Sequence, residues 1–173
     1  MTEKTNLADQ AAKKLGLQTA FIGILPTLRE SMLTLDQMSK VNRYFLITER
    51  LLELRKGNPL HVDIERLSSI HLTRSDVMFE SAATSFQIHV QLKLEESVQA
   101  YNISQVLAGP MVAICANSPF FLGQKLWDES RIPVFEQALK LSDFPGSKLK
   151  DPVTMGQRFI KESLLEIFED NLV

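Results

Sequence analysis

The sequence has a single cysteine, Cys115, in 173 residues, so no disulfide can form within the chain. Chains that cannot form internal disulfides are typical of a reducing compartment, and we expect a cytoplasmic protein. The sequence also has no cluster of lysine and arginine, and its formal net charge at pH 7 is only -2. This charge pattern is not typical of a nucleic-acid-binding or membrane-surface protein, so we expect neither kind of partner.

Long hydrophobic runs are missing as well. The longest nearly uncharged apolar stretch, residues 106–116, is far shorter than the ~20 residues that a membrane-spanning helix requires. Residues 1–16 contain no apolar stretch of the kind found in signal peptides. What the chain does have is a hydrophobic fraction of 45% and a charged fraction of 23%, which are ordinary values for a globular protein with one core.

The most informative short segment is TSFQIHVQL, residues 84–92. Apolar residues alternate with polar ones, and this two-residue period predicts a strand with one buried and one polar face. The polar face would carry Gln87, His89 and Gln91, which we call the polar row. We expect the polar row to face a concave surface, whereas a solvated sheet face is the simpler alternative.

Helical and strand patterns are mixed along the rest of the chain, which predicts a single α+β domain over residues 1–173. Strand patterns cover residues 17–26, 60–66, 68–75 and 81–92. Helical patterns cover residues 6–15, 39–56, 95–116, 134–141 and 156–170. The second half of the 95–116 helix is apolar nearly all round, which predicts burial, and Pro110 is expected to kink or split it.

Several stretches together resemble the glutamate–cysteine ligase family, which belongs to the glutamine synthetase-like carboxylate–amine ligases. They cover roughly residues 20–140 in the order of the family and read GILPTL, NRYFLITERLLELRKGNPLHVDI, FESAATSFQIHVQL, GPMVAICANSPFFLGQ and LWDESRIPVFEQAL. The resemblance implies an antiparallel sheet flanked by helices, as part of a glutamine synthetase-like catalytic fold. It also implies that glutamate is joined to cysteine with ATP, in the presence of Mg²⁺, as in glutathione biosynthesis.

Such chemistry needs groups that hold a triphosphate beside an anionic substrate, namely metal ligands and arginine side chains. Gln87 and His89 match the Q-x-H pattern of the superfamily, so the resemblance assigns the polar row to the nucleotide and its first two members to the metal. Arg131 matches a family arginine in the S-R-I context and is the expected catalytic residue, which would grip phosphate or carboxylate. For each residue a purely structural role remains the alternative. Cys115 is expected to be a buried, inert thiol.

The sequence departs from the family pattern in two ways. Close relatives often carry an arginine and an aromatic residue where this chain has Glu129 and Pro133, which leaves the exact substrate open. The acidic metal ligands of the family come largely from strands that we expect to lie outside residues 1–173. We therefore expect a fragment of a longer catalytic domain, inactive alone and prone to self-association, while a small complete domain is the alternative.

Two further functions stay open at this point. One is a non-catalytic binding or interaction module that keeps the fold of the family. The other is a carboxylate–amine ligase that uses an amine other than cysteine.

Overall fold

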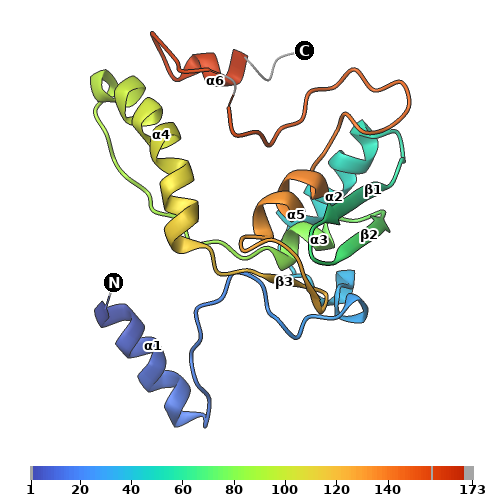
Figure 1. Ribbon diagram of the computed structural model, residues 1–173, viewed down its shortest axis with the longest axis vertical. Coiled ribbons are helices and arrows are strands. Elements are labelled where there is room, and N and C mark those ends of the chain that lie inside the picture. The colour runs from blue at the N-terminus through green and yellow to red at the C-terminus, as the bar shows by residue number, and fades with distance from the viewer. Residues whose placement is uncertain (1, 157, 170–173) are drawn as a thin grey trace.

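The structure of the protein is a computed structural model, and it describes residues 2–156 and 158–169. Helices and a small antiparallel sheet are mixed along the chain, so the predicted α+β class with an antiparallel sheet flanked by helices is confirmed. Figure 1 shows a compact unit built from α2, α3, α5, β1 and β2, with α1 and α4 standing away from it. No helix in the described part of the chain is both long enough and apolar enough to cross a membrane.

The sheet of the compact unit consists of β1 (Leu60–Glu65) and β2 (Ser69–Arg74), which pair antiparallel from Leu60↔Arg74 to Glu65↔Ser69. Both strands were predicted from the sequence. In β1 the side chains of Leu60, Val62 and Ile64 are buried, and those between them are partly or fully exposed. The alternation therefore identifies the buried face correctly, because successive side chains of a strand point to opposite sides.

Three helices belong to the compact unit beside this sheet. They are α2 (Asn42–Leu54), α3 (Met78–Ala82) and α5 (Arg131–Ala138). The helix α5 packs on β1 and α3, and its Val134 and Ala138 are completely buried. Phe79 of α3 meets Phe121 edge to face, with ring centroids 6.0 Å apart. These contacts join segments far apart in sequence into one core.

A short hairpin with two-residue strands precedes α5. Its strands are β3 (Phe120–Phe121) and β4 (Gln124–Lys125), joined by Leu122 and Gly123. Both joining residues have positive φ, 48° and 79°, which is the type I′ geometry that matches the twist of paired strands. The hairpin places Phe121 in the core.

The helices outside the compact unit are α1 (Thr2–Lys14), α4 (Ser97–Cys115) and α6 (Leu165–Glu169). Helix α4 continues through Pro110, so the expected split is wrong. Its second half is exposed rather than buried, with Val106 62% and Ile114 81% exposed. The prediction failed because an apolar helix is buried only where another element covers it. The final helix was predicted over residues 156–170, of which 157 and 170 lie outside the described residues, and α6 occupies only its last part.

Two predicted strands are not formed. Residues 17–26 have no regular structure, and Phe21 is 72% exposed, although Gly23 and Ile24 are buried. Residues 84–92 also have no regular structure, and the apolar set that was expected to be buried is exposed, namely Phe86, Ile88, Val90 and Leu92. A strand needs a neighbour along its length to satisfy its backbone groups. In the described chain Thr84 N donates to Gly23 O at 3.1 Å, but neither stretch forms a strand ladder.

Candidate functional site

The residues around Arg131 form a hydrogen-bonded polar group beside a cavity. We call Ser118, Glu129 and Arg131 the Arg131 cluster. Arg131 Nε and Nη2 donate to the two carboxylate oxygens of Glu129, at 2.5 and 2.8 Å. Its Nη1 donates to the carbonyl oxygen of Thr84 at 2.9 Å. Two parallel N–H···O bonds to one carboxylate form a bidentate pair, which fixes the plane of the guanidinium relative to Glu129.

Local backbone geometry explains how the cluster forms. The chain after α4 runs beside the chain before α5, because Ser118 N donates to Asp128 O and Ser130 N donates to Ser118 O, at 3.2 and 3.0 Å. Ser118 Oγ donates to Glu129, and both side chains are nearly inaccessible to solvent. Glu129 Oε2 also accepts from the backbone N–H of Asn117 at 3.3 Å. The carboxylate therefore ties together the loop that follows α4 and the start of α5.

The electrostatics of the pair agree with this geometry. Burial alone would raise the pKa of Glu129, but the hydrogen bonds from Arg131, Ser118 and Asn117 outweigh it and hold the pKa below its usual value of 4.5. The hydrogen bonds to Glu129 raise the pKa of Arg131 in turn. Both groups are charged at neutral pH, and the pair as a whole is neutral.

A cavity of about 550 Å³ opens beside the cluster. Its wall includes Glu80 of α3, Gln87 of the irregular segment, Cys115 at the end of α4, and Glu129 and Arg131. A guanidinium carries five N–H donors, and three of those of Arg131 are used by Glu129 and Thr84, which leaves two for a bound anion. The cavity can thus accept an anionic group at Arg131.

Glu80 is a charged residue of the cavity wall that the sequence provided no reason to expect there. Burial raises the pKa of Glu80, and the nearby charge of Arg43 partly opposes that increase. No hydrogen bond to its carboxylate is present within the described part of the chain. A half-buried carboxylate that faces a cavity can accept a hydrogen bond from an ammonium or hydroxyl group of a ligand. Its only signal in the sequence is its place four residues before the alternating segment, residues 84–92.

The predicted site residues are only partly brought together. Gln87 and Arg131 line the same cavity, whereas His89 and Gln91 do not. His89 Nε2 lies 3.3 Å from Oε1 of Gln87, so these two members of the polar row share one side of the segment. Cys115, expected to be buried, is exposed because the end of α4 is uncovered.

Mg²⁺ prefers octahedral oxygen coordination, with carboxylates and water as its usual ligands. An imidazole and one amide, as in His89 and Gln87, do not provide that set. Across residues 2–156 and 158–169, no three His, Cys, Asp or Glu side chains are grouped so that they could hold a metal ion. The described residues thus do not fit a magnesium site by themselves.

Comparison with known proteins supplies the family. A family model described as "Glutamate-cysteine ligase family 2" matches residues 1–157 of the chain. No curated protein and no solved structure matches it at a significant level. The matched region contains the polar row, the Arg131 cluster and the cavity between them, and it covers most of the chain. The chain therefore belongs to glutamate–cysteine ligase family 2.

Proposed function

We propose that the chain serves an ATP-dependent ligase that joins the γ-carboxylate of glutamate to the amine of cysteine. The observation that carries this proposal is the family match over residues 1–157. A carboxylate is a poor acyl donor, so its oxygen first attacks the γ-phosphorus of ATP and ADP leaves. The amine nitrogen then attacks the acyl carbon, phosphate leaves, and the nitrogen loses a proton. Glutathione biosynthesis uses this bond.

Arg131 is the residue that we assign to the anionic substrate. Arg131 lines the cavity, and the two N–H groups that Glu129 and Thr84 leave unused can donate to a carboxylate or phosphoryl oxygen there. Glu129 and the Thr84 carbonyl fix the orientation of the guanidinium, so little side-chain entropy remains to be lost on binding. Gln87 lines the same cavity and contributes a neutral hydrogen-bonding side chain beside the anion.

The polar row is proposed to bind the nucleotide. Gln87 connects it to the cavity, and His89 and Gln91 continue it along the chain. Mg²⁺ belongs with the nucleotide in this proposal, and its carboxylate ligands are not assigned to the described residues. The single cysteine supports a cytoplasmic location for the protein.

A second candidate function is a binding module of the same family that does not turn over substrate. The Arg131 cluster favours it, because Glu129 neutralises the guanidinium and so weakens its attraction for a polyanion. A ligase that takes a different amine is compatible with the same cavity.

Two measurements on the purified chain separate these functions. The first is the shift in melting temperature caused by glutamate and by ATP with Mg²⁺, because a ligand that binds the folded state raises it. The second is ADP release with glutamate and a panel of amines. Cysteine-dependent ADP release supports the ligase and contradicts the expected inactivity of the chain alone. Stabilisation by ATP with Mg²⁺ but without ADP release fits a ligase chain that is inactive alone, whereas no stabilisation by the nucleotide supports a module that does not bind it.

Variants of Arg131 connect either outcome to the cavity. Arg131→Lys keeps the charge but loses the planar fork, so we expect weaker stabilisation by the anionic ligand. Arg29→Lys, outside the cavity, is the matched control. Equal ligand responses of both variants would remove Arg131 from the proposed site.

A further inference from the structure

The segment of residues 85–92, between α3 and α4, has exposed apolar side chains and a backbone that is unpaired in the described chain. Its apolar side chains are exposed, with Phe86 68%, Ile88 72% and Val90 67% accessible. Within the described structure, residues 85–92 make no backbone–backbone hydrogen bond. An extended apolar stretch with unpaired N–H and C=O groups is a template for another strand.

The sequence of this segment is symmetric in its chemistry. Read outward from His89, Ile88 stands opposite Val90, Gln87 opposite Gln91, and Phe86 opposite Leu92. An antiparallel pair of two identical segments, centred on His89, places every apolar side chain against an apolar one. It also places every amide against an amide, and His89 against His89 of the second copy. Lys93 then faces Ser85, so the pairing opposes no two lysines.

We propose that residues 86–92 pair antiparallel with the same residues of a second copy of this chain, across a two-fold axis at His89. Such an interface is isologous, because one surface serves both partners. The contact between Nε2 of His89 and Oε1 of Gln87 supports the extended conformation, since residues i and i+2 of a strand share a face.

A two-stranded ribbon is only marginally stable until something covers its apolar face. Helix α4 can supply that cover. Phe86 shares a cavity wall with Met111 and Val112 of α4, and the exposed Val106 and Leu107 lie on the same helix. Figure 1 shows the segment reaching the margin of the molecule beside α4, where a second copy can approach. In this structure Gln87 and Phe86 line the same cavity, and strand pairing would turn the polar row to the face opposite the apolar side chains.

The first test is sedimentation equilibrium of the full chain from about 1 to 100 µM. We expect a monomer of 19.6 kDa in equilibrium with a dimer of twice that mass. His89→Pro removes one backbone donor while all the apolar side chains stay, and we expect it to raise the dissociation constant at least tenfold. His89→Ala keeps the N–H and is the matched control, with a change of less than about threefold.

A charge pair tests the register. In the proposed arrangement residue 87 faces residue 91 of the second copy, so Gln87→Lys/Gln91→Glu places opposite charges together and tightens the dimer. Gln87→Glu/Gln91→Glu places like charges together and weakens it. A parallel pairing would oppose like charges in both variants. These side chains are exposed, so neither change should disturb folding, which circular dichroism checks.

Three results would overturn the proposal. They are a monomer at every concentration, a dimer equally sensitive to His89→Pro and His89→Ala, and a dimer weakened by both charge pairs. Each outcome is independent of ligase activity, so the proposed function and this interface stand or fall separately.

Discussion

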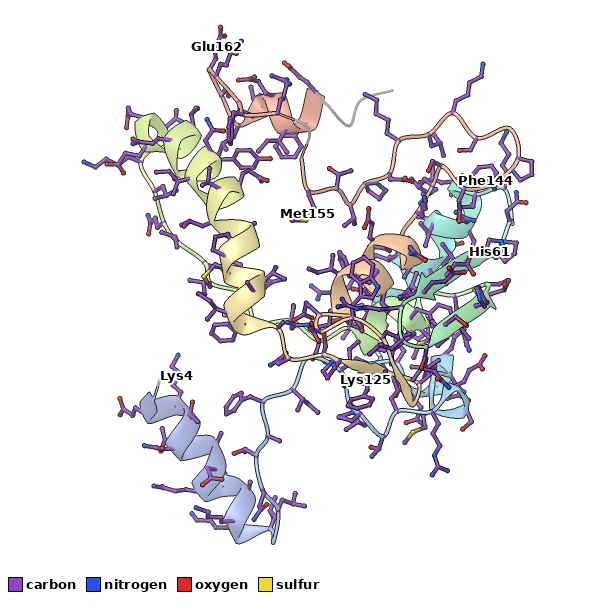
Figure 2. All side chains as sticks on the ribbon, viewed as in Figure 1. Lys4, His61, Lys125, Phe144, Met155 and Glu162 are labelled. Carbon is purple, nitrogen blue, oxygen red and sulfur yellow. The ribbon has the colours of Figure 1, made fainter. Side chains whose placement is uncertain are left out.

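Arg55 at the end of α2 and Asp143 in the loop after α5 form an ion pair in which the guanidinium is fully buried. The same side chain donates to three backbone carbonyl oxygens, those of Asn58, Pro59 and Lys140. Its guanidinium carbon lies 5.3 Å from the ring centroid of Phe144, which Figure 2 labels beside the end of α2. One residue thus links α2, the start of β1 and the chain that leaves α5.

Removing this guanidinium should be costly. We expect Arg55→Met to lower the free energy of unfolding by about 3–5 kcal/mol, because the carbonyl oxygens and Asp143 would lose their donor in a buried setting. Arg50→Met is the matched control on the same helix, since the Arg50–Glu53 pair is exposed and should cost about 1 kcal/mol or less. Urea denaturation measures both, and similar losses would contradict a central role for Arg55.

The Glu129–Arg131 pair should give stability a defined pH dependence. The pKa of Glu129 is lowered in the folded state, so its ionised form contributes stability above the unfolded-state pKa, and this contribution is lost as the pH falls through the folded-state pKa. We expect wild type to exceed Glu129→Gln in stability at pH 7, with the difference shrinking below pH ~4.5. Denaturation at several pH values checks this. A difference independent of pH would show that the amide and the carboxylate interact alike.

Glu80 should behave in the opposite way. Burial raises its pKa in the folded state, so the protonated form is favoured there and stability falls as the pH rises through the folded-state pKa. Glu80→Gln is therefore expected to be more stable than wild type at pH 7, with less advantage near pH 4. The same pH series measures it. A variant less stable than wild type at pH 7 would mean that the charged Glu80 is stabilised by a partner.

Gly23 lies directly against the Arg131 cluster. A Cβ atom there would stand 2.7 Å from Nε of Arg131 and 2.9 Å from Cβ of Ser118, closer than side chains pack. We expect Gly23→Ala to destabilise the protein by about 1–3 kcal/mol through overpacking, and to weaken any ligand response that depends on Arg131.

Gly109→Ala is the matched control for that substitution. Nothing lies within 4 Å of a Cβ atom at Gly109 in α4. Alanine improves helix propensity by about 0.5–1 kcal/mol, less the crowding that Pro110 imposes on the residue before it. We therefore expect little or no loss in thermal unfolding. Equal losses at the two glycines would contradict the close approach at Gly23.

The sequence by itself determined the elements whose signals are local. The β1 strand alternates strictly, so the same residues face the core whatever packs on them. The apolar stripe predicts a helix over residues 39–56, and α2 lies inside those bounds at Asn42–Leu54, followed by Gly57 with a φ of 78°. The family resemblance was also readable in the sequence, because it lies in the order of several short stretches, and the family match confirms it.

Only the tertiary structure decided which apolar segments are covered and which charges meet. Residues 84–92 have a strand pattern but no neighbour in the described chain, and a strand is made by its partner's hydrogen bonds. The second half of α4 is as apolar as a core helix, yet no described element covers it. The Glu129–Arg131 pair is readable as two adjacent charges, but its closure on Ser118, Thr84 and Gly23 depends on loops meeting from distant parts of the chain. Local patterns record the preferences of a segment, whereas burial and ion pairing depend on what else arrives beside it.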